Sequence, residues 1–208
     1  MLSTVDALLP LSLLEAVRDV DKPADLDSEF VDELRNKRLG LSDTVYLQIK
    51  RYAEAVRKGQ RAQHDESVAL AKLIGRRPDA DAVFRAAGQY LARESYRTIN
   101  PVSRRMIRIL PSMLARPLAL RRTRTIAQRY LNGSVKRVGG YVLLDVPNSV
   151  TLNTGPGTVG CTYYEAMLRE LLALLIGGVG SVDHVRCAGR GEGTCEWRAD
   201  WKTFEKSA

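Results

Sequence analysis

The sequence predicts an α+β fold in which a four-stranded antiparallel sheet packs with helices, preceded by a helical N-terminal annex. Three observations lead to this class. Apolar residues recur at helical spacing up to residue 131, strand-like segments with glycine turns follow from residue 134, and one apolar helix interrupts those segments. We expect residues 1–78 to form the helical extension and residues 79–208 to form the α+β domain.

The helical half is delimited by capping and breaking residues. Asn100 and Pro101 favour a helix start, because asparagine caps the first turn and proline at the first position loses no hydrogen bond. Pro111 and Pro117 each predict a break in the helix that follows, and Asn132 predicts its end. Earlier helices are expected over residues 8–20, 42–58 and 67–74, and from about residue 79.

The strands are predicted from β-branched and apolar residues that lie between turns. Residues 135–146 favour a strand with a bulge or bend at the glycines 139–140, and residues 149–154 favour another. Two further strands, 182–188 and 194–201, flank a glycine-rich turn. This arrangement is typical of an antiparallel sheet backed by helices.

The charge of the chain is concentrated in one segment. The net charge is +8, yet residues 93–137 hold twelve arginines and lysines against Glu94 alone. Such a segment favours an anionic partner, which can be nucleic acid, phospholipid headgroups or an acidic protein surface. The simpler interpretation is a solvated arginine-rich helix face. Aromatic residues are sparse there, which argues against a surface for single-stranded nucleic acid.

No apolar run approaches the roughly 20 residues of a membrane-spanning helix. The first twenty residues lack the basic region and the cleavage site of a secretion signal. We therefore expect a cytoplasmic protein in which the three cysteines stay reduced.

The cysteines Cys161, Cys187 and Cys195 all fall in the last 50 residues and are expected to converge. Cys187 and Cys195 are symmetric about Gly191, so a turn centred there makes them cross-strand neighbours. Such a pair can share a soft metal, oxidise to a disulfide or pack as small apolar residues. Cys161 precedes an apolar helix that Thr162 opens as part of a predicted capping box with Glu165.

A structural zinc site needs four protein ligands, and the sequence offers three clear ones. His184 lies three residues before Cys187 and is expected on the opposite strand face unless a bulge intervenes. Asp145 and Glu192 are alternative fourth ligands without a spacing argument. Buried thiols that shape a pocket are the alternative to a metal.

Catalytic motifs are lacking in the sequence. We find no Ser-His-Asp arrangement, no phosphate-cradling glycine motif and no dinucleotide fingerprint. The glycines of residues 155–160 precede a helix, where an anion can dock, although a tight turn explains them equally well. The question of an enzyme stays open, with a non-catalytic role favoured.

Together, Cys161, the apolar helix, Cys187, the glycine turn, Cys195 and the aromatic strand resemble the 4-vinyl-reductase-type domain. Relatives of that domain include sensory domains of bacterial regulators that respond to aromatic compounds, and the transport-particle subunits of vesicle tethering. The likeness covers residues 80–201. It implies a four-stranded antiparallel sheet with helices around an apolar pocket, and a homodimer. It also implies zinc held by the three cysteines and an upstream glutamate, for which the nearest acid here is Asp145.

We therefore expect a non-catalytic sensory or carrier domain that binds a small hydrophobic molecule and signals through a homodimer. The alternatives are a nucleic-acid-associated regulator that uses residues 93–137, or a subunit of a reductase. The expected metal is zinc, held by Cys161, Cys187 and Cys195. The residues expected to line the ligand pocket are Tyr164, Met167, Leu168, Leu171 and Trp197.

Overall fold

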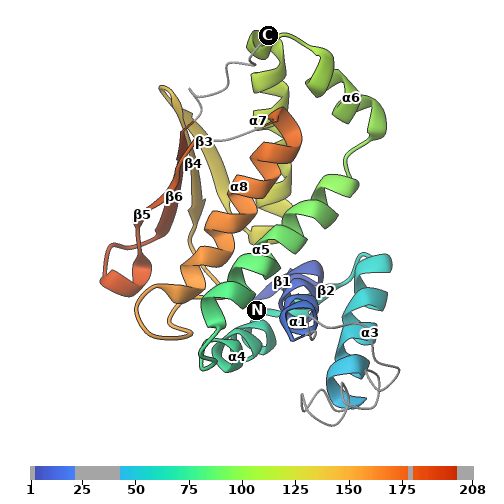
Figure 1. The fold of residues 1–208 in the computed structure, drawn as a ribbon, viewed down its shortest axis with the longest axis vertical. Helices are drawn as coiled ribbons and strands as arrows, with labels where there is room; N and C mark the ends of the chain where they lie inside the picture. The colour runs from blue at the N-terminus through green and yellow to red at the C-terminus, as the bar shows by residue number, and fades with distance from the viewer. Residues whose placement is uncertain (1–2, 22–42, 178–179, 201–208) are drawn as a thin grey trace, which may run out of the picture.

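The structure, a computed structural model, describes residues 3–21, 43–177 and 180–200 (Figure 1). A four-stranded antiparallel sheet packs with helices, which confirms the predicted α+β class. Its strands lie in the order β3-β4-β6-β5, so β6 is an interior strand. They are β3 (Ser134–Val138), β4 (Tyr141–Val146), β5 (Val182–Arg186) and β6 (Cys195–Asp200).

Helices make up most of the remaining described chain. None of those described has both the length and the apolar character needed to cross a bilayer. Two short strands, β1 (Thr4–Asp6) and β2 (Arg61–Gln63), form a separate antiparallel pair. The α-helices are α1 (Leu8–Val20), α3 (Asp43–Arg57), α4 (His64–Ile74), α5 (Ala80–Arg97), α6 (Pro101–Ile109), α7 (Ser112–Leu131) and α8 (Thr162–Ile176).

Helix α8 lies at the centre of the core. Figure 1 shows it along one face of the four-stranded sheet, and α5 crosses it. The crossing is close because Gly88 of α5 has no side chain: a Cβ there would lie 2.1 Å from the carbonyl oxygen of Tyr163 and 2.9 Å from the nitrogen of Met167. The two helices therefore meet backbone to backbone, which fixes the position of α8.

The N-terminal helix α1 belongs to the same core. Most of its residues are buried, and the Ser12 hydroxyl lies 3.0 Å from that of Tyr163 in α8. One hydrophobic cluster contains residues from both sides of position 78. The described parts of the predicted extension and domain thus pack together, and the boundary at residue 78 stays a prediction.

The region predicted as one bent strand over residues 135–146 is a hairpin. Strands β3 and β4 pair with Val135 opposite Leu144, and the glycines 139–140 form the turn between them. Gly139 has a φ of 58°, which a two-residue hairpin turn favours.

Three of the four predicted helix boundaries in the basic segment are confirmed, and one is wrong. The Asn100 side chain accepts a hydrogen bond of 2.9 Å from the nitrogen of Val102 at the start of α6. Asn132 ends α7 in the left-handed conformation. Pro111 separates α6 from α7, but Pro117 lies inside α7. Because Pro117 is exposed, the carbonyl that loses its hydrogen bond there can be solvated by water.

Residues 149–154 form turns rather than the predicted strand. Their hydroxyl groups bond to the local backbone in place of a neighbouring strand: Thr154 Oγ1 donates to the Thr151 carbonyl at 2.9 Å, and Thr151 Oγ1 donates to the Gly160 carbonyl at 2.6 Å. Asn153 adopts a φ of 53°, which a β-strand does not contain. The result is a compact loop that leads back toward the start of α8.

The predicted capping box at the start of α8 is also wrong. The 3₁₀ helix η1 (Val159–Cys161) runs directly into α8, so Cys161 already has helical φ and ψ angles of −71° and −20°. Thr162 Oγ1 therefore donates backward to the Val159 carbonyl at 2.7 Å, and Glu165 pairs with Arg169. The first turn of α8 is consequently oriented by η1.

Candidate metal centre

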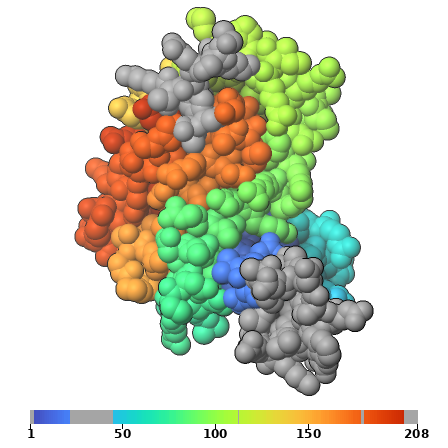
Figure 2. All heavy atoms as spheres, viewed as in Figure 1, coloured from blue at the N-terminus to red at the C-terminus, as the bar shows by residue number. Residues whose placement is uncertain are grey.

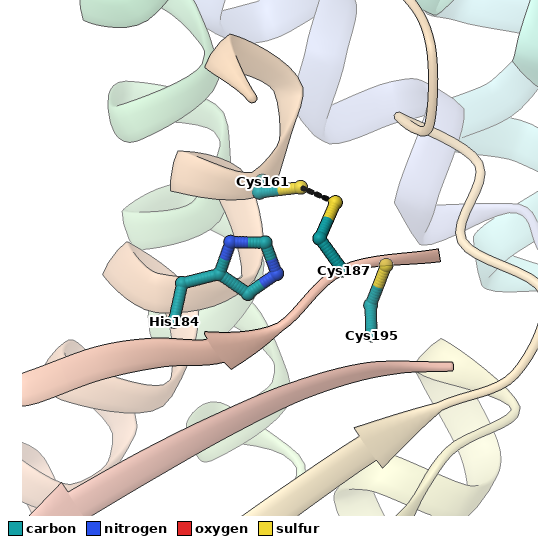
Figure 3. Close-up of side chains that lie close together, drawn as sticks. All are labelled: Cys161, His184, Cys187 and Cys195. Carbon is teal, nitrogen blue, oxygen red and sulfur yellow. Dashed lines mark hydrogen bonds between the residues drawn. The ribbon is translucent and has the colours of Figure 1, made fainter. Parts of the chain in front are cut away.

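Three cysteines and one histidine converge at the N-terminal end of α8 (Figure 3). Cys161 ends η1, His184 belongs to β5, Cys187 follows β5 and Cys195 begins β6. Their candidate ligand atoms, three sulfurs and one imidazole nitrogen, all lie within 4.8 Å of one another. The cluster can therefore hold a metal ion.

The cysteines meet because of the strand register. Arg186 pairs with Glu196, and continuing that register by one residue sets Cys187 opposite Cys195. Between Cys161 and Cys187 the sulfur–sulfur distance is 4.0 Å, and all three thiols are free. The three thiols converge as the sequence predicts, with no disulfide between them.

A β-bulge brings His184 to the same side as the cysteines. Strand β5 pairs His184 with Trp197 but Arg186 with Glu196, so the register shifts by one residue between these two pairs. Without the bulge, the odd spacing between His184 and Cys187 would place their side chains on opposite faces. In Figure 3 the imidazole is directed toward the sulfurs. The bulge thus adds a donor beyond the three predicted ones.

The imidazole lacks a hydrogen bond that a buried ring nitrogen requires. His184 Nε2 is buried and has no hydrogen-bond partner among the described residues. The ring stacks on the Trp197 indole with centroids 4.8 Å apart and an angle of 15° between the planes. Burial, and then the positive charge of Arg190, lower the pKa of His184, which favours the neutral ring that binds metals. The unpaired nitrogen and the three sulfurs can thus serve together as ligands of one metal ion.

Two of the three thiols, Cys161 and Cys195, have a pKa above the usual value of a cysteine. Burial raises the pKa of Cys161, and the nearby sulfurs of Cys187 and Cys195 add to the effect. Burial likewise raises the pKa of Cys195. A metal ion binds thiolates, so its binding must release the protons of these thiols.

Neither carboxylate considered as a fourth ligand belongs to the cluster. Glu192 Oε2 instead accepts a hydrogen bond of 2.6 Å from the backbone nitrogen of Cys187 and pairs with Arg190 at 3.0 Å. It therefore fixes the backbone beside a ligand rather than the ion itself, as outer residues of metal sites do. Asp145 lies on β4 opposite Glu196, outside the cluster, in which His184 is the fourth donor.

A cavity of about 230 Å³ adjoins the cluster. Cys161 and Cys187 form part of its wall, and the remainder comes from the loop 151–160 and from Gly189 and Arg190. Gly160 is required for this loop to approach, because a Cβ there would lie 2.1 Å from the Thr151 carbonyl oxygen. Gly160 therefore serves the packing of the loop, and the cavity borders Cys161 and Cys187.

The five residues predicted to line a ligand pocket are packed in the core, each with an exposed fraction of at most 1%. The Tyr164 ring lies 4.8 Å from the Trp197 ring, and its hydroxyl accepts a hydrogen bond of 3.1 Å from the Val150 nitrogen. Tyr164 and Trp197 thus form part of the contact between α8 and the sheet. The full set is Tyr164, Met167, Leu168, Leu171 and Trp197, and their role toward a ligand stays a prediction.

An apolar cavity that the sequence did not indicate lies at the other end of α8. Its volume is about 230 Å³, and it is enclosed by α6, α7 and the last turn of α8. Helical periodicity identifies Ile107 and Leu110 as apolar positions but cannot show that a space remains between three helices. The walls are formed by Ile107, Leu110, Ala115, Ala173, Leu174 and Ile176, with Arg108 and Arg116 beside them.

Comparisons of the chain with protein-family models, with curated proteins and with solved structures give no match. The chemistry of the cluster therefore carries the functional argument. Three thiols and an imidazole are soft and borderline donors, which suit zinc and other thiophilic ions better than magnesium or calcium.

Proposed function

We propose that this protein is a zinc-binding sensory or carrier domain without catalytic activity, in which the metal orders one end of a helix and a small hydrophobic molecule binds at the other. The observation that carries the proposal is the convergence of four donor atoms within 4.8 Å, including a buried imidazole nitrogen without a partner. The resemblance to the 4-vinyl-reductase-type domain supports it.

Zinc is the ion that the donor set favours. A site of three thiolates and one imidazole gives the four ligands of a structural zinc centre and leaves no open position for a substrate. The four residues come from η1, β5, the residue after β5, and β6. The ion would therefore join the start of α8 to the β5–β6 hairpin, and would stabilise the fold by its binding free energy.

The zinc proposal is tested by the metal content of protein that is purified without chelator. We expect one zinc ion per chain, and we expect Co²⁺ in its place to give the absorption of a tetrahedral site with thiolate ligands. His184→Gln should weaken the binding, whereas His64→Gln, which removes the only other histidine, should not. A wild-type protein that neither retains zinc nor binds Co²⁺ would end the proposal.

The ligand part of the proposal rests on the apolar cavity beside the last turn of α8. Aliphatic side chains dominate its walls, as in pockets that bind small apolar molecules. Ala173 lies in α8 itself, so a molecule in the cavity would contact the helix whose other end Cys161 adjoins. The homodimer that the resemblance implies would pass the signal on.

Small aromatic and aliphatic compounds provide the test. We expect at least one of them to raise the melting temperature of the wild-type protein, and Ala173→Leu, which fills the cavity, to abolish that shift. Ala82→Leu places the same side chain at an exposed position of α5 and should leave the shift unchanged. Equal ligand shifts in Ala173→Leu and wild type, or no shift with any compound, would contradict this part while leaving the zinc proposal standing.

A further inference from the structure

Helix α6 exposes an apolar face to solvent. Val102, Met106 and Ile109 follow one another at helical spacing, so they share one side of the helix. Their exposed fractions are 65%, 50% and 69%. On the other side, Ile107 is the one residue that α6 buries. The outward apolar face is therefore not explained by packing within the described chain.

The exposed face continues into the start of α7. Met113 and Leu114 follow the corner at Pro111 and are 85% and 57% exposed. Figure 2 shows this α6–α7 corner as an outer edge of the molecule. We call the five side chains Val102, Met106, Ile109, Met113 and Leu114 the corner face. An apolar outer edge of this kind suits insertion into a lipid surface better than capture of a helix.

Arginines border the corner face. Between residues 95 and 144 the sequence contains no aspartate or glutamate. Arg104 and Arg105 line an open groove of about 400 Å³ beside Tyr96 and Ile109. The Arg104 guanidinium lies 5.3 Å from the centre of the Tyr96 ring, and its buried Nε has no hydrogen-bond partner among the described residues. The guanidinium groups of Arg104 and Arg105 line the groove and can donate hydrogen bonds to an anionic group such as a phosphate diester.

We propose that the corner face docks on the surface of an anionic phospholipid bilayer, with its apolar side chains in the interface and lipid phosphate in the arginine groove. Interfacial helices combine an apolar face with flanking basic residues in this way. Anionic lipids attract each basic residue near the surface. A second copy of the chain would bring together two basic segments that contain no acidic residue between residues 95 and 144. Nucleic acid would contact the arginines but would leave the apolar side chains exposed to water.

Sedimentation with lipid vesicles tests the proposal. We expect binding to vesicles of phosphatidylcholine with 30% phosphatidylserine, weaker binding at higher salt, and little binding to phosphatidylcholine alone. Arg104→Gln with Arg105→Gln should weaken the binding by about 25-fold, because each basic side chain contributes about fivefold. Met113→Ser with Leu114→Ser should weaken it by roughly 100-fold, at about tenfold for each apolar side chain.

Matched controls lie on α3 and α4, which Figure 1 places at the other end of the molecule from α6. Arg57→Gln with Lys72→Gln removes the same charge from exposed positions. Leu47→Ser with Leu73→Ser removes side chains that are 60% and 61% exposed. We expect both controls to bind the anionic vesicles as the wild type does.

Several results would overturn the docking proposal. One is a wild type that does not bind the anionic vesicles, and another is an equal loss in the control variants. Salt-dependent DNA binding without vesicle binding would assign the arginines to nucleic acid instead. If the protein does not bind vesicles but forms a dimer that Met113→Ser with Leu114→Ser dissociates, the corner face is an interface between copies of the chain.

Discussion

The imidazole of His184 lies flat against the indole of Trp197, with 4.8 Å between the ring centres. The same imidazole contributes the nitrogen of the candidate metal centre. A metal ion bound to His184 would therefore withdraw electron density from a ring that stacks on the fluorescent indole of Trp197.

We expect zinc to change the fluorescence of Trp197. The measurement uses the Trp201→Phe background, because Trp201 is the only other tryptophan. His184→Ala should lower the zinc affinity by roughly 100-fold or more, since about 10–16 kcal/mol of binding free energy is shared among four ligands. If the emission of the Trp201→Phe protein does not change when zinc is added, the idea that zinc binds beside Trp197 is contradicted.

Cys187→Ser and Cys195→Ser are expected to lower the melting temperature of zinc-loaded protein by similar amounts. Each removes one ligand from the same ion, so the loss of binding free energy should be alike. After zinc is removed by a chelator, the two variants should differ from wild type by only about 1 kcal/mol, the cost of burying a hydroxyl in place of a thiol. Equal, small effects with and without zinc would show that the thiols only fill space.

Gly88→Ala should destabilise the protein, although alanine normally stabilises a helix by about 1 kcal/mol over glycine. The added Cβ would collide with the backbone of Tyr163 and Met167, so α5 and α8 must separate. We expect a loss of at least 2 kcal/mol in chemical denaturation, which is the scale of overpacking in a core. The exposed change Ala82→Gly on the same helix should cost about 1 kcal/mol. A Gly88→Ala protein as stable as the wild type would contradict the close crossing.

Arg77 joins the end of α1 to the start of α5 by pairing with Asp21 and Asp79. Its two bonds to the Asp79 carboxylate are each 2.8 Å long, and this pairing holds the pKa of Asp79 below its usual value. A lowered folded pKa gives stability that is present above the unfolded pKa of about 3.8 and is lost as the pH falls further. We expect Arg77→Ala to cost about 1–2 kcal/mol at pH 7.

The acid dependence gives the decisive comparison for Arg77. The stability difference between wild type and Arg77→Ala should shrink as the pH is lowered below about 4, because Asp79 then becomes protonated. Arg76→Ala, an exposed neighbour, should show neither the loss nor the pH dependence. A difference that is constant from pH 7 to pH 3 would show that Arg77 acts through packing alone.

The cysteine arrangement could be predicted because it follows from symmetry in the chain. Cys187 and Cys195 are equidistant from Gly191, and any hairpin centred there brings them together. The position of His184 could not be predicted, because one extra residue at a β-bulge moves the following side chains to the other face of the strand. The number of residues between His184 and Cys187 does not show whether such a bulge is present. The strand expected over residues 149–154 was wrong because threonine hydroxyl groups there bond to the local backbone, and the segment does not pair with another strand.

The helix α8, of 15 residues, has the candidate metal centre at its first turn and the apolar cavity at its last. Two ligands that bind to one protein affect each other reciprocally. By whatever factor bound zinc would change the affinity of the cavity for a small molecule, that molecule would change the affinity for zinc by the same factor. The concentration of one small molecule would then set how firmly the chain retains its ion.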